Sequence, residues 1–334
     1  MEIKNFILEV DSDVLDVLST DFQYSNTNSV PNRSDSFLSF ERGVTKKGKT
    51  LKTCVLYVDV RNSIALTQKH DAETMGKIYT TFAKSVIKAA KHHYGHVRNI
   101  IGDRVMIIFP SANCFTNAVD CAVTINHISK FIINTRFPDV DFKCGIGIDY
   151  GEMKVIKVGI QRRGTEAAEN KSLVWTGNPA NIASRLTDNA NKIVKETFYK
   201  VIRNPINLRA IKPLFGMAGI GGMYGGFSNY DPKAPFYLST TEEVEMTTEQ
   251  FANNISSYKG GELYMSGGNF ISFSKKEKTY KYPSILMTDE VYNGFRKSNL
   301  TRDSIVNKYW NETAHLIKNY RGKLFGGDVH WEIK

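Results

Sequence analysis

Residues 51–151 carry apolar patterns whose order constrains the fold of this chain more than any other feature. The expected elements are, in order, a strand (51–60), a helix (about 71–94), two strands joined at Gly102-Asp103, a helix (about 111–135) and a strand (144–151). The order β-α-β-β-α-β predicts an α+β fold: a split, ferredoxin-like (palm) sheet, rich in antiparallel pairs, with helices on one side. The other face of that sheet would stay open for a partner or a substrate.

Further segments flank or interrupt this pattern. Residues 1–48 predict an N-terminal helix and a polar arm, and a compact domain is expected over 49–334. The composition shifts at about 204–282, where residues 216–226 alone contain six glycines. This stretch is interpreted as a mobile insertion or flap. A phosphate-cradling loop is the weaker alternative, because the glycine spacing matches neither G-x-G-x-x-G nor a P-loop.

Charge and cysteine content exclude some classes of protein. The 44 Lys and Arg against 34 Asp and Glu give a formal charge of +10, but the basic residues are scattered, so a dedicated nucleic-acid-binding surface is not expected. The four cysteines lack the spacing of zinc sites and predict free thiols. The acidic, amphipathic start is no secretory signal, and no apolar run approaches the ~20 residues that span a bilayer. A cytoplasmic protein is therefore expected.

Two aspartates stand where strand-like runs stop. Asp59 is near the end of the apolar run CVLYVDV, and Asp103 lies in the turn of VRNIIGDRVMIIF. Carboxylates held rigidly at a sheet edge form an anionic site suited to Mg²⁺ or Mn²⁺ and a nucleoside triphosphate. Taken alone, each aspartate is equally well a turn residue. The motifs around them decide between these interpretations.

Four motifs follow one another along the chain: LYVDVRNS, NIIGDRVMIIF, GIGIDYG and TGNPANIASRL. This ordered set resembles the catalytic domains of class III nucleotide cyclases, over about residues 50–200 and 283–334. The resemblance implies that the ribose 3′-oxygen of a nucleoside triphosphate attacks the α-phosphate and releases pyrophosphate. Active sites of that family form between two catalytic domains. Because this chain has one set of motifs, the resemblance implies a head-to-tail homodimer with composite active sites.

The resemblance also implies roles for residues of these motifs. Asp59 and Asp103 match the metal-binding aspartates, and the carbonyl of Val60 would be a further ligand of two divalent cations, Mg²⁺ or Mn²⁺. Asn181 and Arg185 match the catalytic Asn-x-x-x-Arg pair, in which Asn181 orients the ribose and Arg185 neutralises charge on the α-phosphate. Four residues apart, they share one helical face. Outside this motif they would be interpreted as a capping residue and a surface arginine.

Phosphate contacts are implied less specifically. Arg162 and Arg163 correspond approximately to a basic position that contacts phosphate in the family, although one of them is expected to be simply solvated. Lys323 is placed like the family's triphosphate-binding lysine, and Arg321 is an alternative for that role. Arg61, beside the first aspartate, either contacts phosphate or forms an outward salt bridge.

The positions that read the base depart from the purine cyclases. They hold Asn99 and Val174 in place of the Lys or Glu and the Asp or Cys of purine enzymes, and altered partners usually mean an altered substrate. Tyr57 stands where phenylalanine is usual; it can pack on a base and donate a hydrogen bond, or simply belong to the core. Together these positions look like the bacterial pyrimidine cyclases of the Pycsar anti-phage system, which make cyclic UMP or cyclic CMP as a signal for a separate effector. UTP is slightly favoured over CTP as the substrate.

Other classes of protein are weighed against a pyrimidine cyclase. An adenylate or guanylate cyclase is one alternative. A catalytically silent nucleotide-sensing module is another, but the retained pairs Asp59/Asp103 and Asn181/Arg185 argue against it. The sequence FGGD at 325–328 suggests a diguanylate cyclase, but Val329 and His330 follow in place of the acidic and aromatic residues that such an enzyme needs. Asn62 and Ser63 replace the Gly and Phe that commonly follow the first metal aspartate, so a different phosphate loop is expected.

Overall fold

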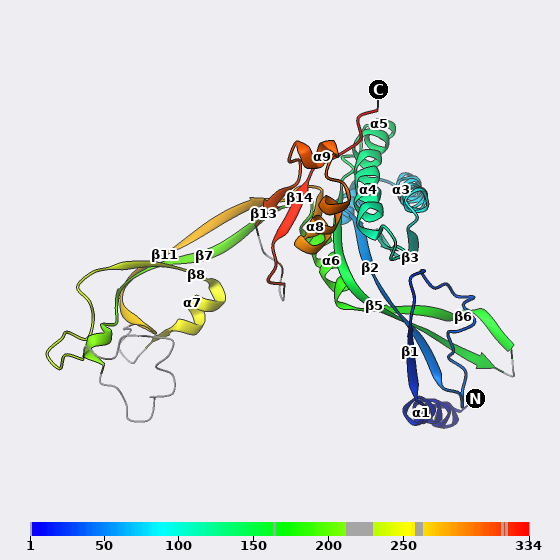
Figure 1. The fold of residues 1–334 in the computed structure, drawn as a ribbon, viewed down its shortest axis with the longest axis horizontal. Coiled ribbons are helices and arrows are strands. Elements are labelled where there is room, and N and C mark those ends of the chain that lie inside the picture. The colour runs from blue at the N-terminus through cyan, green and yellow to red at the C-terminus, as the bar shows by residue number, and fades with distance from the viewer. Residues whose placement is uncertain are drawn as a thin grey trace. The chain divides into compact units, whose positions relative to one another are not determined.

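The computed structural model divides into two compact units, drawn in Figure 1. The first unit contains Met1–Ile193 and Lys281–Lys334, and the second contains Val194–Tyr280, where the sequence predicts an insertion at about 204–282. The described residues are 2–162, 165–211, 230–257, 263–314, 317 and 320–333. The glycine-rich stretch 216–226, with its two alternative interpretations, lies outside them.

A mixed sheet forms the centre of the first unit. Its strands lie in the order β13-β14-β12-β5-β2-β4-β3, with β1 beside β2 and β6 beside β5. Only the pairs β1–β2 and β5–β12 are parallel among the described strands, so the predicted antiparallel-rich sheet is confirmed. The strands are β1 (Phe22–Asn26), β2 (Lys46–Val60), β3 (His96–Ile101), β4 (Arg104–Ile108), β5 (Cys144–Arg162), β6 (Thr165–Thr176), β12 (Ile285–Thr288), β13 (Asn311–Thr313) and β14 (Leu324–Gly327).

Helices flank this sheet in the positions that the apolar periodicity predicts. The helix expected over about 71–94 is α3, and the one expected over about 111–135 is α4 with its two continuations, η1 and α5. The described helices of the first unit are α1 (Ile3–Ser19), α2 (Ser63–Lys69), α3 (Ala72–His92), α4 (Cys114–His127), the π-helix η1 (Ile128–Ile133), α5 (Asn134–Arg136), α6 (Asn178–Asn189), α8 (Asp289–Ser298) and α9 (Asp303–Val306).

β2 is the central strand, and its register fixes where its one acidic residue lies. It pairs antiparallel with β5 on one side and β4 on the other, so that Asp59 lies opposite Gly145 and Arg104. A strand buried on both faces has a nearly continuous apolar sequence, as in CVLYVDV. Asp59 is therefore a carboxylate at the end of an otherwise buried strand.

Helices cover both faces of the sheet, so the prediction of helices on one side is wrong. Successive residues of β2 point to opposite faces: Val58 packs in a core with α3, α4 and α8, whereas Val55 packs in another core with α6. α6 reaches the sheet because Gly147 of the GIGIDYG motif has no side chain. A Cβ atom at Gly147 would collide with the backbone carbonyl of Ala183 in α6.

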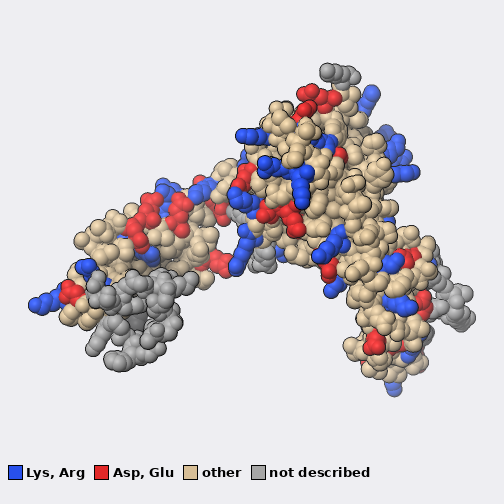
Figure 2. All heavy atoms as spheres, in the orientation of Figure 1, with Lys and Arg blue, Asp and Glu red and all other residues tan. Residues whose placement is uncertain are grey.

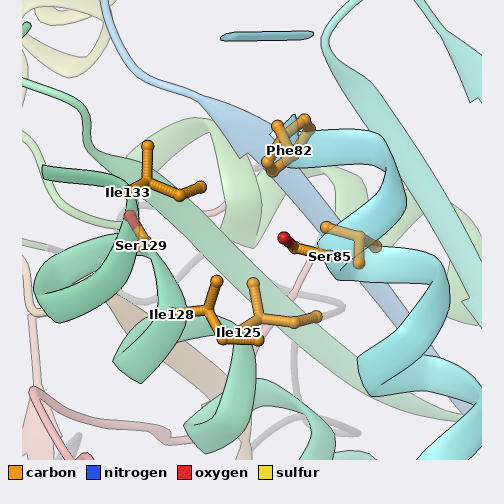
Figure 3. Close-up of a pocket in the computed structure, with 7 residues that line it drawn as sticks. Phe82, Ser85, Ile125, Ile128, Ser129 and Ile133 are labelled. Atoms are coloured by element: carbon orange, nitrogen blue, oxygen red, sulfur yellow. The ribbon is translucent and has the colours of Figure 1, made fainter. Parts of the chain in front are cut away.

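A small cavity lies between α3 and the segment that continues α4, as Figure 3 shows. Its lining is mainly apolar, with two hydroxyl groups: Phe82, Ser85, Val86, Ile125, Ile128, Ser129 and Ile133. Single π-helical turns often occur near functional sites, and η1 contributes to this lining. The cavity nevertheless belongs to the α3–α4 face, whereas Asp59 points to the α6 face. It is a packing gap in the core.

The N-terminal arm is part of the first unit. The five residues of β1 pair in parallel with residues 46–50, which begin β2. α1 is held by Asp16, which accepts hydrogen bonds from Lys46 Nζ (3.0 Å) and from the backbone N–H of Gly43 (2.7 Å). None of the residues of α1 is buried, so its apolar side chains are exposed to solvent.

The second unit has a sheet and a small core of its own. Among its described residues the strand order is β8-β7-β11-β10-β9. Val201, Met246 and Met265 form the core, and the rings of Tyr199 and Phe251 stack with centroids 4.0 Å apart. The elements are β7 (Ile193–Pro205), the 3₁₀-helix η2 (Leu208–Ala210), β8 (Glu242–Thr247), α7 (Thr248–Asn254), β9 (Ile255–Ser257), β10 (Leu263–Met265) and β11 (Gly268–Lys281).

Charged residues of both signs are distributed over the molecular surface. On the face drawn in Figure 2, Lys and Arg are interspersed with Asp and Glu. All four cysteines are buried and free, as the sequence predicts. Within the described part of the chain, no helix combines the length and the apolar character that crossing a membrane requires.

Candidate active site

The two aspartates predicted to bind metal lie together at one end of the sheet. Asp59 is the penultimate residue of β2, and Asp103 lies in the turn between β3 and β4. The carbonyl of Asp103 accepts a hydrogen bond from the backbone N–H of Val60 (3.4 Å), so all three predicted metal ligands share this edge. Burial raises the pKa of Asp59, and the negative charge of Asp103 adds to this rise, whereas the hydrogen bond from Arg104 opposes it.

An open hollow of about 620 Å³ lies beside Asp103. Its lining mixes polar and apolar groups: Ser63, Ile64, Thr67, Gln68, Tyr79, Gly102 and Asp103. Just before α2, Asn62 adopts a left-handed backbone conformation with φ of 56°. Asparagine tolerates this conformation better than most residues do. This property explains how Asn62 can stand where the related motifs commonly have glycine.

Two arginines hold the Asp59 carboxylate. Arg61 and Arg104 each donate a hydrogen bond to Oδ2 of Asp59, over 3.1 and 3.0 Å. Arg61 also donates to the backbone carbonyl of Asp188 (3.2 Å). Arg104 donates to Ser184 Oγ (2.8 Å) and to the carboxylate of Asp188. Arg61 therefore points into the protein, not outward as one of its two interpretations supposes.

α6 carries the predicted Asn181 and Arg185 pair on a polar face. Asn181, Ser184, Arg185 and Asp188 follow one another at intervals of three, one and three residues, which places all four on one side of the helix. Asn181 is exposed and Arg185 is half-buried. The face that holds the predicted catalytic pair thus also holds the α6 partners of Arg104.

Tyr57 and Asn99 lie in one row across three strands. Each lies opposite Met106 of β4, Tyr57 from β2 and Asn99 from β3, and residues opposite one another share a sheet face. The Tyr57 hydroxyl donates to Met106 Sδ (3.0 Å), a weak acceptor. Burial raises the pKa of Tyr57, so its phenol stays protonated at neutral pH. We call the edge that holds Asp59, Val60 and Asp103 the acidic edge. Because Tyr57 and Asp59 are two residues apart on β2, the row of Tyr57 and Asn99 lies on the same sheet face as Asp59.

Val174 lies on the far side of its strand from this row. It is opposite Ile156 in the β5–β6 pair, and 38% of its surface is exposed. Its neighbour Trp175 points to the other side of β6 and packs against the core that contains Met106. The Trp175 ring also lies under the Arg98 guanidinium, 6.0 Å from ring centroid to Cζ. Sequence reasoning overlooked Trp175, whose only signal is an aromatic residue beside a predicted base-reading position.

Lys323, one of the predicted phosphate-binding cations, does not lie near Asp59 within one chain. Lys323 forms an ion pair with Glu312 (2.8 Å), and this hydrogen bond raises the pKa of Lys323. The strand registers place Lys323 toward the other end of the sheet, on the order of 20 Å from Asp59 by strand spacing. Arg162 ends β5, but its side chain lies outside the described part of the structure, as does the whole of Arg163.

Comparison with known proteins identifies the family. No protein-family model matches the chain. The chain is 30% identical over 181 residues to a uridylate cyclase of Burkholderia cepacia, a match that covers 53% of this chain and 74% of that protein. The chain belongs to the class III nucleotide cyclases.

Further relatives of this nucleotide cyclase span similar lengths. A uridylate cyclase of Xanthomonas perforans is 28% identical over 195 residues, covering 56% of this cyclase and 79% of that protein. The crystal structure of the adenylyl cyclase CyaB from P. aeruginosa matches 42% of this cyclase and 73% of that chain, with 21% identity and a TM-score of 0.37.

The acidic edge of the cyclase fits a divalent cation in its donor types. Asp59 and Asp103 offer carboxylate oxygens and Val60 offers a backbone carbonyl, and such hard oxygen ligands suit Mg²⁺ and Mn²⁺. Among the described residues, no three His, Cys, Asp or Glu side chains gather as a metal site. The remaining ligands would therefore come from water or from the phosphates of a nucleotide, as is usual for Mg²⁺.

Three residues at this edge of the cyclase were missed by sequence reasoning: Arg104, Ser184 and Asp188. Arg104 directly follows Asp103, so alternation along β4 could have placed it beside Asp59 once the strand pairing was assumed. Ser184 and Asp188 stand three and seven residues after Asn181, so helical periodicity could have found them. What no local pattern contains is the contact between β4 and α6.

Proposed function

We propose that this cyclase converts a pyrimidine nucleoside triphosphate, UTP or CTP with UTP favoured, into the 3′,5′-cyclic monophosphate and pyrophosphate. The observation that carries the proposal is the row of Tyr57 and Asn99 on the face that also holds Asp59. The similarity to two uridylate cyclases supports a pyrimidine substrate.

Tyr57 and Asn99 suit a pyrimidine base in their chemistry. The Tyr57 ring can pack on a base. Its protonated hydroxyl, whose acceptor among the described residues is the weakly accepting Met106 thioether, is available to donate. The Asn99 amide offers both a donor and an acceptor, so it pairs with uracil or cytosine by flipping. Val174 is the third predicted base contact, and Trp175 is its half-buried neighbour.

The acidic edge and α6 divide the reaction between them. Asp59, Asp103 and the Val60 carbonyl would hold two divalent cations, Mg²⁺ or Mn²⁺. Such cations lower the pKa of a bound hydroxyl and neutralise triphosphate charge. Asn181 donates to the ribose and holds its 3′-oxygen near the α-phosphate, which supplies orientation. Arg185 stabilises the negative charge that develops on the α-phosphate.

A head-to-tail homodimer with composite sites completes the proposal. Asp59 and Asp103 come from one chain, and Asn181, Arg185 and Lys323 come from the other. The separation of roughly 20 Å between Lys323 and Asp59 within one chain supports this division, because one triphosphate is too short to contact both. Arg162, at the end of β5, and Arg163, which lies outside the described residues, are further candidates for phosphate contact.

Incubation with each of the four nucleoside triphosphates and Mn²⁺ or Mg²⁺, followed by chromatography, tests the function. Cyclic UMP or cyclic CMP is the expected product, and it should disappear in an Asp59→Ala protein. Cyclic AMP or cyclic GMP alone would replace the pyrimidine proposal with a purine cyclase. No product from any nucleotide, together with nucleotide binding, would indicate a silent sensing module.

The biological role that we propose is anti-phage defence from the cytoplasm, with the cyclic pyrimidine nucleotide as a signal for a separate effector. Expression of the cyclase with its effector should reduce phage plaque formation. An Asp59→Ala protein should not protect, and equal protection by that variant would separate defence from catalysis.

A further inference from the structure

The Asp59 carboxylate is hydrogen-bonded to two arginines, whereas the proposed function requires it to bind a divalent metal ion. Its Oδ2 accepts hydrogen bonds from both guanidinium groups, and only 14% of its side chain is exposed. A divalent cation and a guanidinium compete for the same lone pairs and the same negative charge. A cation that binds through Oδ2 must therefore displace one of the arginines.

Burial and alternative partners distinguish the two arginines. The Arg61 side chain is 4% exposed, and its other partner is a backbone carbonyl, so its removal from Asp59 would leave a buried charge without a counter-ion. The Arg104 side chain is 29% exposed and already contacts a second carboxylate, that of Asp188, as well as Ser184 Oγ. Arg104 can therefore leave Asp59 and remain both paired and hydrated.

We propose that Arg104 is a displaceable counter-ion of Asp59, which a divalent cation replaces at Oδ2 while Asp188 and Ser184 retain the guanidinium on α6. The inference rests on the metal site of the proposed function. Arg61 stays in place and fixes the position of the carboxylate. Before the cation binds, Arg104 shares with Arg61 the neutralisation of a partly buried carboxylate that the negative charge of Asp103 disfavours.

This exchange acts on the helix that carries the predicted catalytic pair. Ser184 and Asp188 lie on the same face of α6 as Asn181 and Arg185. In the proposed homodimer, that face of α6 serves the second active site, whereas Asp59 serves the first. Within one chain, Arg104 thus contacts both Asp59, a metal ligand of one site, and α6, the helix that supplies the catalytic pair of the other site.

Binding of Mn²⁺ to the nucleotide-free protein tests the inference without using activity. Free Mn²⁺ is followed by electron paramagnetic resonance at constant ionic strength, up to millimolar concentration. Arg104→Gln removes the competitor and should bind Mn²⁺ roughly two- to fivefold more tightly than the wild type, the range of a partly exposed ion pair. Asp188→Asn removes the alternative partner and should bind Mn²⁺ more weakly. In the Arg104→Gln background, Asp188→Asn should have no further effect.

Arg98→Gln is the matched control for the loss of one positive charge. Arg98 is a half-buried arginine of the neighbouring β3 that donates to the backbone carbonyls of Val97 and Val30, so its loss should leave Mn²⁺ affinity unchanged. If Arg104→Gln does not fold by circular dichroism, Arg104→Lys replaces it. A lysine cannot bridge Asp59, Ser184 and Asp188 at once, so its affinity should fall between those of the wild type and the glutamine variant.

Asp59→Asn separates failure of the inference from failure of the proposed function. If Asp59→Asn leaves Mn²⁺ binding unchanged, or if the wild type binds none, the metal site itself is wrong and the role of Arg104 with it. If Asp59→Asn abolishes binding but Arg104→Gln binds no more tightly than the Arg98→Gln control, only the counter-ion inference is overturned.

Discussion

Arg61 lies against Asp59 with Nη2 3.1 Å from Oδ2, and only 4% of the Arg61 side chain is exposed. The other terminal nitrogen donates to the carbonyl of Asp188, in the last turn of α6, where a positive charge is favoured by the helix dipole. One buried side chain therefore ties the strand that carries the acidic edge to the helix that carries Asn181.

Loss of the Arg61 guanidinium should destabilise the first unit. Arg61→Gln leaves a carbonyl and part of a carboxylate without donors, so the free energy of unfolding should fall by about 2–3 kcal/mol. Urea denaturation followed by circular dichroism measures the change. Lys77→Gln is the control, because its ion pair with Glu73 is exposed on α3 and should contribute less than about 0.5 kcal/mol. Equal stability of both variants would show that Arg61 is not a structural tie.

Complementation tests the composite site directly. Asp59→Ala and Asn181→Ala proteins should each be inactive, since every site of either homodimer lacks one essential residue. A mixed dimer has one site with both defects and one with neither, so mixing should restore up to about a quarter of wild-type activity, because half of the dimers are mixed and each has one of two sites. Coexpression with two different tags allows the mixed dimer to be purified. An inactive mixed dimer would exclude the shared site.

Tyr57→Phe should affect the substrate more than the fold. The ring is kept, and the hydroxyl contacts only the weak acceptor Met106 Sδ among its described partners, so unfolding by urea should be nearly unchanged. Loss of a hydrogen bond to the base should lower kcat/KM for UTP by roughly three- to tenfold. Tyr292→Phe, whose ring stacks on Phe325 in the first unit, should leave kcat/KM unchanged. Equal effects of both substitutions would remove Tyr57 from the base site.

Asp149 should make stability depend on pH. Burial raises its pKa from 3.8 to about 6, although the hydrogen bond from Thr288 Oγ1 (2.7 Å) opposes this shift. Because the folded state binds the proton more tightly, the resulting stabilisation is complete below pH 3.8 and is lost as the pH rises through 6. Asp149→Asn keeps an acceptor that cannot ionise.

The Asp149→Asn protein should be about 2–3 kcal/mol more stable than the wild type at pH 7, and this difference should shrink toward zero near pH 4. Urea denaturation at several pH values measures both changes. A difference that stays constant with pH would mean that Asp149 does not titrate in this range.

Two glycines offer a matched test of how α6 docks on the sheet. Gly147→Ala should lower the melting temperature by several degrees, because its Cβ would meet the Ala183 carbonyl and lie 2.5 Å from the backbone nitrogen of Thr187. Gly76→Ala on the exposed side of α3 meets nothing within 4 Å and should stabilise by about 0.5–1 kcal/mol through helix propensity. Similar effects of the two substitutions would contradict the close approach of α6.

The elements of the fold were predictable from local patterns, whereas their docking was not. Periodicity predicted α3 and the α4 segment, and the Gly102-Asp103 turn correctly joins β3 and β4. The prediction of helices on one side failed because α6 depends on Gly147, a tertiary contact that has no periodicity of its own.

The candidate active site was likewise predictable only in part. Asp59 and Asp103 could be placed together from strand ends alone, but Arg104 and Asp188 pair across 84 residues, which no motif records. At the base-reading positions, the difficulty is to predict which face of the strand each side chain occupies. A shift of one residue moves a side chain to the opposite face of a strand. Val174, the predicted base contact, and the next residue, Trp175, therefore lie on opposite faces of β6.

The pairing of β1 with β2 has a consequence for how the enzyme tolerates proteolysis. Its five residues satisfy the backbone groups of residues 46–50, which would otherwise form an uncovered strand edge at the start of β2. β1 is joined to β2 by the segment 27–45, so a protease cut there would leave β1 held by non-covalent contacts alone. Cleaved molecules that lose the arm would then recruit strands from one another and precipitate, although every proposed catalytic residue would still be present.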